Sequence, residues 1–168
     1  DATASVTYTI NGKEVTGPTI EVADAGTYDG KAKTPSVTVK DGDTVIPSNE
    51  YSVSYENNTN AGTATVKITD VAGGNYIVNG SQTFEIDQAT ITVTPKAGQE
   101  KTYGTDDPKL KYNVSGAENN ETPVFIGALS RTDGTDVGEY KITQGTLKLT
   151  DGDGFTDTNY RLEFSNGV

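Results

Sequence analysis

The residues best suited to binding an ion are three acidic side chains near the end of the chain. Asp151, Asp153 and Asp157 carry hard carboxylate oxygens, the kind of ligand that calcium prefers. An EF-hand-like loop would also need oxygen ligands at its fifth and twelfth positions, where this sequence has Phe155 and Leu162. We therefore expect a hairpin loop here, with the three aspartates as weak calcium candidates. We predict no other metal site and no catalytic or cofactor-binding residue.

Six tyrosines recur at matching points of the two halves and could form a surface on which sugars stack. Alternatively, their rings lie in the core or at corners, with the hydroxyl groups bonded to the backbone. Recurrence favours the structural role, because two repeated units share packing more readily than a ligand. The six are Tyr28, Tyr55, Tyr76, Tyr103, Tyr140 and Tyr160. Replacing Tyr28 or Tyr103 by Ala is then expected to cost about 3 kcal/mol or more, as for any buried aromatic ring.

Residues for catalysis are scarce. The chain has no Cys and no His, so it lacks a thiol nucleophile and the commonest general base. Asp106-Asp107 before Pro108 is typical of a turn, and paired carboxylates arise by chance among 24 acidic residues. The repeated glycines open no phosphate-binding loop, since neither GxxxxGK[ST] nor GxGxxG before a helix occurs. A lysine–asparagine crosslink would need a buried Lys, Asn and acid in contact, which sequence cannot show. We predict that the chain is not an enzyme.

The charge excludes two classes of partner. The formal net charge is −11, and no basic stripe alternates with aromatic residues. Phosphate backbones and anionic lipid surfaces would both be repelled. We therefore expect no nucleic-acid partner. We also expect no direct membrane insertion, because no apolar stretch approaches membrane-spanning length.

The composition favours β-structure throughout. Thr occurs 27 times, and Val and Ile together occur 24 times against 5 Leu. Branched side chains pack well on a pleated surface, and the 19 Gly supply turns between strands. The sequence predicts an all-β, mainly antiparallel protein, Ig-like sandwich or β-grasp-like. At most a short helical turn is expected near residues 122–127, around Pro123.

One series of motifs occurs twice in the same order. Thr27-Tyr28-Asp29-Gly30 is echoed by Thr102-Tyr103-Gly104, and Asn75-Tyr76 by Asn159-Tyr160. A period this long indicates two tandem domains rather than a solenoid. We predict domains at residues 1–88 and 89–168, joined near 87–90, and we expect each fragment to fold alone.

The start of the chain predicts a β-hairpin over residues 6–15. Val6–Ile10 alternates, Asn11-Gly12 suits a type I′ turn, and Lys13–Val15 would form the return strand. The segment is either an extra element or the end of a preceding module. We interpret the chain as a piece of a larger protein, whose export or anchoring signals would lie outside it.

Several of these motifs resemble known domain families. The first half, over about residues 19–87, resembles the YDG-type domain. The motifs that carry this resemblance are Tyr28-Asp29-Gly30-Lys31 with Pro35, residues 51–55, residues 57–64 and Gly74-Asn75-Tyr76. The second half, over about residues 89–167, resembles the MBG domain of the YGX type. The motifs that carry this resemblance are Tyr103-Gly104, Asp107-Pro108, Arg131, Val137-Gly138 and Asn159-Tyr160. The second resemblance is the more specific, since several separated pieces agree in order and spacing.

These resemblances imply tandem modules of secreted or surface-anchored bacterial proteins, often adhesin-like. They transfer no catalytic or ligand residue. We expect a non-catalytic structural spacer, extracellular and monomeric, that contacts neighbouring repeat modules of its own chain. The alternative is a module that binds carbohydrate or glycoprotein such as mucin, with host glycoprotein or polysaccharide as its partner.

Overall fold

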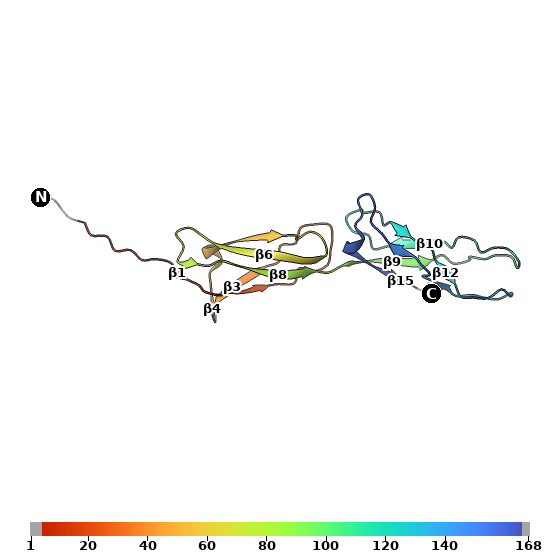
Figure 1. Ribbon diagram of the computed structural model, residues 1–168, viewed down its shortest axis with the longest axis horizontal. Helices are drawn as coiled ribbons and strands as arrows, with labels where there is room; N and C mark the ends of the chain where they lie inside the picture. The colour runs from red at the N-terminus through yellow and green to blue at the C-terminus, as the bar shows by residue number, and fades with distance from the viewer. Residues whose placement is uncertain (1–4, 166–168) are drawn as a thin grey trace. The chain divides into compact units, whose positions relative to one another are not determined.

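The computed structural model describes residues 5–165, and its contacts divide the chain into two compact units (Figure 1). Of the described residues, unit 1 comprises 5–25, 33–58 and 63–85. Unit 2 comprises 26–32, 59–62 and 86–165. Two short segments from the first half of the sequence therefore belong to unit 2. The domain boundary near 87–90 stays a prediction.

Unit 1 is built from β-strands in small sheets. In one sheet β3 lies between β2 and β4, with antiparallel pairing, and in the other β6 lies between β5 and β8. A parallel pair, β1 with β7, completes it. The bounds are β1 Lys13–Glu14, β2 Thr19–Val22, β3 Val37–Asp41, β4 Thr44–Val45, β5 Tyr51–Glu56, β6 Gly62–Asp70, β7 Tyr76–Ile77 and β8 Gly80–Ile86.

Alternation along β6 explains the core of unit 1. Ala64, Val66 and Ile68 are buried, whereas Lys67 between them is exposed. Successive side chains of a strand point to opposite faces, so one face of β6 supplies the core and the other meets water. Phe84 of β8 packs edge-on against Tyr55, with ring centroids 6.1 Å apart.

The predicted hairpin over residues 6–15 is wrong. Lys13 and Glu14 pair in parallel with Tyr76 and Ile77, and residues 5–12 form no strand. A type I′ turn needs positive φ at both central residues, and neither Asn11 nor Gly12 has it. The backbone groups of Lys13 and Val15 donate instead to Asn75 O and Ile77 O. Pairing with a distant strand replaces the local turn.

Unit 2 is organised around β9, which lies between two strands of opposite sense. β10 pairs with it antiparallel, and β15, the last strand, pairs with it in parallel. Two short antiparallel pairs, β11 with β14 and β12 with β13, complete the unit. The bounds are β9 Ala89–Pro95, β10 Tyr112–Ser115, β11 Phe125–Ile126, β12 Ser130–Arg131, β13 Ile142–Thr143, β14 Lys148–Leu149 and β15 Tyr160–Phe164. Val93, Leu129 and Leu147 form a buried cluster.

The all-β, mostly antiparallel class is confirmed. No α-helix occurs between residues 5 and 165, where helical geometry is limited to the 3-10 turns η1 (Ser48–Glu50) and η2 (Asp157–Asn159). The short helical turn expected near 122–127 is absent from this part of the chain. Phe125 pairs with Leu149, and Thr150 N donates to Val124 O at 3.1 Å, so β-pairing takes up this backbone. Within the described residues there is also no helix long and apolar enough to cross a membrane.

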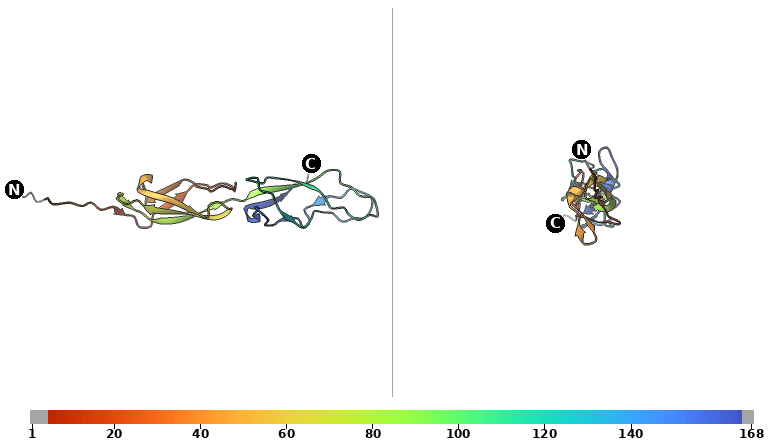
Figure 2. Two further views of the ribbon diagram at one scale, coloured as in Figure 1. Left: turned by 90° about the horizontal axis from the view of Figure 1, so that it is seen from above. Right: turned by 90° about the vertical axis from the view of Figure 1, so that its left-hand side faces the viewer.

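Figure 2 shows the same strands from two further sides. Between residues 5 and 165, no buried side-chain nitrogen or oxygen lacks a hydrogen-bond partner. Within the described residues, no buried polar side chain is therefore left unsatisfied in a way that would point to a ligand.

Candidate functional site

A largely buried group of polar and aromatic side chains in unit 2 surrounds Tyr160. We call Tyr28, Glu121, Phe155 and Tyr160 the tyrosine cluster. Tyr160 begins β15 directly after the η2 turn, and its ring is stacked on Phe155 with centroids 5.1 Å apart. Tyr28 meets Tyr160 edge-on at 5.4 Å, and its backbone N–H is fixed by Asp87 O at 2.8 Å. Both phenol rings are buried.

One carboxylate serves both hydroxyl groups of the tyrosine cluster. Tyr28 Oη donates to Glu121 Oε1, and Tyr160 Oη donates to Glu121 Oε2 at 3.0 Å while accepting from Glu118 N at 3.1 Å. Burial, and then the nearby Glu121, raise the pKa of Tyr28 and raise the pKa of Tyr160 to about 12. Both phenols are therefore protonated at physiological pH, so neither is a nucleophile or a base. The cluster is suited to packing.

Asn159, next to Tyr160, joins the segment 59–62 to η2. Its side chain is buried, with Oδ1 accepting from Ala61 N at 2.8 Å and Nδ2 donating to Asn60 Oδ1 at 3.2 Å. These bonds place residues from the first half of the sequence inside unit 2. The oxygen and the nitrogen of the Asn159 side-chain amide therefore both have hydrogen-bond partners.

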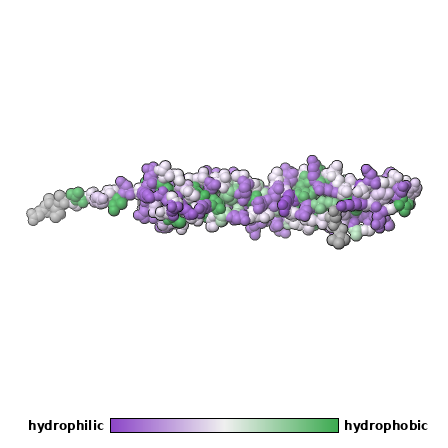
Figure 3. All heavy atoms as spheres, turned by 90° about the horizontal axis from the view of Figure 1, so that it is seen from below, coloured by the Kyte–Doolittle hydropathy of each residue, from purple (hydrophilic) through white to green (hydrophobic). Residues whose placement is uncertain are grey.

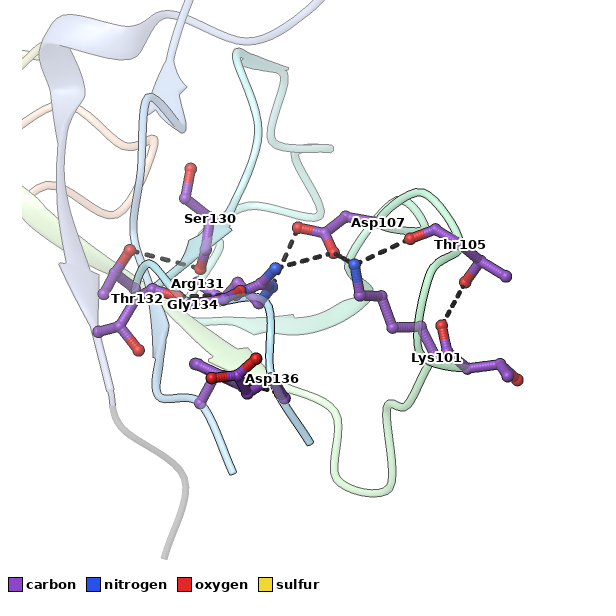
Figure 4. Close-up of polar contacts among 11 residues, drawn as sticks. Lys101, Thr105, Asp107, Ser130, Arg131, Thr132, Gly134 and Asp136 are labelled. Carbon is purple, nitrogen blue, oxygen red and sulfur yellow. Dashed lines mark hydrogen bonds and ion pairs between the residues drawn. The ribbon is translucent and has the colours of Figure 1, made fainter. Parts of the chain in front are cut away.

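A second polar group surrounds Arg131, at the end of β12 (Figure 4). We call Lys101, Asp107, Arg131 and Tyr140 the arginine cluster. Arg131 donates two hydrogen bonds to the carboxylate of Asp107, from Nε to Oδ2 at 3.0 Å and from Nη2 to Oδ1 at 3.2 Å. Lys101 Nζ lies 2.7 Å from Asp107 Oδ1. These hydrogen bonds from Lys101 and Arg131 lower the pKa of Asp107.

The remaining donors of the arginine cluster bind backbone. Arg131 Nη1 donates to Thr132 O at 2.9 Å and to Gly134 O at 2.8 Å. The guanidinium carbon lies 4.8 Å from the centre of the Tyr140 ring, whose hydroxyl group donates to Asp136 O. Gly134 is required beneath this ring, since an added Cβ would lie 2.0 Å from a ring atom. Four N–H groups of the guanidinium donate to internal acceptors, so the cluster holds the loop 96–111 against the loop 132–141.

The three calcium candidates do not gather into an ion site. Asp157 N donates to Asp151 Oδ1 at 3.0 Å, and Asp153 is exposed. Gly152 and Phe155 exchange backbone hydrogen bonds of 3.0 and 3.1 Å, so the loop closes on itself. No group of three or more acidic residues that could hold a metal occurs in the part of the chain that the structure describes.

The six tyrosines occupy different environments. Tyr28 and Tyr160 are buried, and Tyr55, Tyr76 and Tyr140 are partly buried. Tyr55 and Tyr140 use their hydroxyl groups on backbone carbonyls, as corner residues do. The expectation that Tyr103 is buried like Tyr28 is wrong, because its side chain is 69% exposed. It lies in a turn closed by the bond from Thr105 N to Thr102 O.

Unit 1 contains a buried acid that sequence reasoning missed. Glu50 of η1 accepts from Asn75 N at 2.6 Å and from Asn75 Nδ2 at 2.8 Å. The hydrogen bonds from Asn75 lower the pKa of Glu50. The recurrence of Asn75-Tyr76 and Asn159-Tyr160 was the available signal that these asparagines have partners. Nothing distinguished Glu50 or Glu121 from the other acidic residues.

Comparison with known families gives one match. Residues 91–168 match the model of the MBG domain (YGX type). This family consists of non-catalytic modules that are typical of repeats in bacterial surface proteins. No curated protein and no solved structure matches the chain at a significant level. The resemblance of the first half to the YDG-type domain stays a prediction.

The arginine cluster lies within the residues that match the MBG domain. Asp107, Arg131 and Tyr140 all belong to the motifs that carry the resemblance, and the structure brings them together. The spaced motif therefore corresponds to internal contacts that hold the structure together.

Proposed function

We propose that the chain is a non-catalytic spacer module of a bacterial cell-surface or secreted adhesin-like protein. Its work would be to hold a distal domain away from the envelope. The pairing of the first and last strands of unit 2 carries the proposal. β9 and β15 pair in parallel over five positions, from Ala89 with Tyr160 to Val93 with Phe164.

Parallel pairing of these strands determines how unit 2 responds to tension. The chain reaches β9 at Ala89 and leaves β15 after Phe164, which lie at opposite ends of the paired strands. Pulling on the two sides then slides the strands past each other, and all ladder hydrogen bonds resist together. In an antiparallel terminal pair they would open one after another. Resistance to sliding is what a spacer under tension needs.

The polar groups of unit 2 support the same function. The tyrosine cluster and the arginine cluster satisfy their hydrogen bonds internally. The acidic surface, with 24 acidic against 13 basic residues, favours solubility without adhesion to anionic lipid or nucleic acid.

The test is to stretch the full chain from its two ends and to record the unfolding force of unit 2. Ser165 N donates to Val93 O, and alternation along β15 turns the N–H of Glu163 toward β9 as well. Glu163→Pro removes that donor from the ladder. We expect the unfolding force of unit 2 to fall sharply.

Leu147→Ala is the matched control, because Leu147 is buried in the core but lies outside the β9–β15 ladder. It should lower thermodynamic stability with a smaller effect on the unfolding force. Equal loss of force in the two variants, at equal loss of stability, would contradict the spacer. Saturable binding of the unmodified chain to a mucin or a polysaccharide would favour the binding module instead.

A further inference from the structure

Residues 5–10 have the alternating pattern of a β-strand but belong to no sheet. The exposed fractions of Val6, Tyr8 and Ile10 are 94%, 91% and 86%, and Thr7 and Thr9 alternate with them. This segment pairs with no other strand in the described part of the chain. Figures 1 and 2 show it leading away from β1, with no other element of unit 1 beside it. Figure 3 shows apolar residues on it, whereas the visible face of unit 1 is mostly polar.

An exposed row of this kind is unusual in a soluble protein. Alternating β-branched and aromatic residues fit a half-buried strand, and unpaired backbone groups invite a further strand. Contiguous exposed apolar surface commonly marks an interaction site.

The sequence of the segment repeats that of β8. Thr7-Tyr8-Thr9-Ile10 corresponds to Thr83-Phe84-Glu85-Ile86, with aromatic and isoleucine residues at the same alternate positions. In β8 these apolar positions are filled with core residues, because Phe84 and Ile86 are both buried. Phe84 also meets Tyr55 of β5.

The strand that follows each copy pairs in the same register. Lys13 comes three residues after Ile10 and pairs in parallel with Tyr76 of the first Asn-Tyr dipeptide. Ala89 comes three residues after Ile86 and pairs in parallel with Tyr160 of the second. The identical spacing shows that residues 6–10 precede β1 as β8 precedes β9.

The junction between this segment and unit 1 is itself ordered. An added Cβ on Gly12 would lie 3.2 Å from Gly74 O and 3.3 Å from Ile77 Cγ1. Lys13 N donates to Asn75 O at 2.8 Å. Two residues, 11 and 12, therefore separate the exposed segment from the paired Lys13, just as residues 87 and 88 separate β8 from the paired Ala89.

We infer that residues 6–10 are the last strand of a further β module of the same build, in which they take the place that β8 has in unit 1. That module would supply a strand like β6 as the neighbour and an apolar face for Tyr8 and Ile10. A second copy of this chain does not fit, since in each copy β8 already lies beside β6. The inference names the neighbour of the spacer and rests on that function, but it concerns hydrogen-bond pairing and not resistance to force.

The test is an extended chain in which a copy of residues 12–81 is placed directly before Val6. Val6 to Ile10 then follow the copy as Gln82 to Ile86 follow the original. We expect the amides of Thr7 to Ile10 to become protected, with hydrogen exchange slowed by about two orders of magnitude or more. The copied residues should give a third set of folded NMR signals.

The control is the same extended chain with Tyr8→Ser and Ile10→Ser, which should leave units 1 and 2 folded and the copied residues unfolded. Fast exchange at residues 7–10 beside a folded copy would overturn the inference. So would a copy that folds equally well with the two serines.

A second measurement covers the case in which the copy fails to fold for another reason. In the original chain, Gln82→Val, Phe84→Tyr and Glu85→Thr together give β8 the sequence of residues 6–10. We expect unit 1 to keep its fold, whereas Thr83→Tyr, Phe84→Thr and Glu85→Ile, which turn the apolar residues outward, should unfold it. Unfolding by both sets would also overturn the inference, and the force test of the spacer would be unaffected.

Discussion

The dipeptide Asn-Tyr occurs in both units with the same backbone pairing and with different side-chain partners. Tyr76 and Tyr160 both pair in parallel with the strand that opens their unit. In unit 1, Asn75 binds the carboxylate of Glu50, and Tyr76 is only partly buried. In unit 2, Asn159 binds the segment 59–62, and Tyr160 is buried in the tyrosine cluster.

Backbone pairing is the part of the repeat that both units keep, and the side-chain environment is the part that changes. Backbone pairing depends on the strand pattern, which both halves share. The side-chain environment depends on what each unit packs against the dipeptide. Unit 1 uses one acid from η1, and unit 2 uses segments from elsewhere in the chain.

The largest effect that separates the two copies is expected from Tyr160→Ala. It empties a buried ring site between Tyr28 and Phe155 and should destabilise unit 2 by about 3–5 kcal/mol. Tyr76→Ala should cost unit 1 only about 1 kcal/mol, since that ring is already partly in water. Denaturant titration with NMR signals assigned to each unit measures both losses.

Tyr160→Phe is the control, because it keeps the ring and removes the bonds to Glu121 and Glu118. It should cost about 1–3 kcal/mol, the usual penalty for buried polar groups left unpaired. Equal losses from Tyr160→Ala and Tyr76→Ala would end the distinction between the two copies.

The next effect is loss of stability of unit 2 in alkali. The pKa of Tyr160 rises from an ordinary value near 10 to about 12 in the folded chain, and the pKa of Tyr28 is also raised. The unfolded chain then releases its protons first, so stability is complete below pH 10 and falls between pH 10 and about 12. For Tyr160 the loss is about 3 kcal/mol, since one pKa unit corresponds to about 1.4 kcal/mol.

Melting curves across this pH range, with tyrosinate absorbance as the probe of ionisation, measure the loss. Glu121→Gln removes the negative charge between the two phenols and should reduce the alkaline loss without abolishing it, because burial is the larger cause. An unchanged slope in that variant would show that Glu121 does not face the phenols in solution.

A smaller effect of opposite sign is expected for unit 1 in acid. Hydrogen bonds from Asn75 lower the pKa of Glu50 below its ordinary value of 4.5. This contribution is complete above that value and is lost as the pH falls through the lowered pKa. Asn75→Ala should lower the melting temperature of unit 1 at pH 7 and flatten its decline in acid.

Asp107→Asn in unit 2 is the matched control for acid. The pKa of Asp107 is also lowered, but its side chain is half-exposed, so solvent weakens its ion pairs. If the acid decline of unit 1 is identical with and without the Asn75 side chain, Glu50 does not contribute to it.

Patterns that depend on alternation and composition could be predicted from the sequence. The β class and the strand character of 64–69 and 82–86 follow from alternating residues that face core and water. The hairpin at 6–15 failed because Asn11-Gly12 is a local turn signal, whereas Lys13 pairs with a strand more than sixty residues away. Local propensity yields to such tertiary pairing.

The candidate site was harder to predict for a different reason. Motif spacing marked Asp107, Arg131 and Tyr140 without showing that they meet, since a contact between loops has no period in the sequence. Tyr28 and Tyr103 hold matching places in the repeat, yet one ring is buried and the other exposed. A repeat fixes the position along the chain, and the neighbours that cover a ring come from elsewhere.

The smallest effect is expected at Tyr103, whose exposed ring contrasts with the buried ring of Tyr28. Tyr103→Ala should change stability by no more than about 0.5 kcal/mol, because most of the ring is already in water. Tyr28→Ala should cost about 3 kcal/mol or more, since it empties a buried ring site beside Tyr160 and removes the hydroxyl group that donates to Glu121 Oε1. Denaturation midpoints of the two variants, measured side by side, check the difference.

A loss above about 1 kcal/mol for Tyr103→Ala would mean that this ring is packed in solution, and would restore its equivalence to Tyr28. If stability is unchanged, the ring remains available for a ligand, and the same variant tests that role. Titration of the unmodified chain and of Tyr103→Ala with a mucin glycopeptide separates the cases. Equal, negligible binding by both fits a spacer whose exposed tyrosine is incidental, whereas binding lost only in the variant would make Tyr103 a recognition residue.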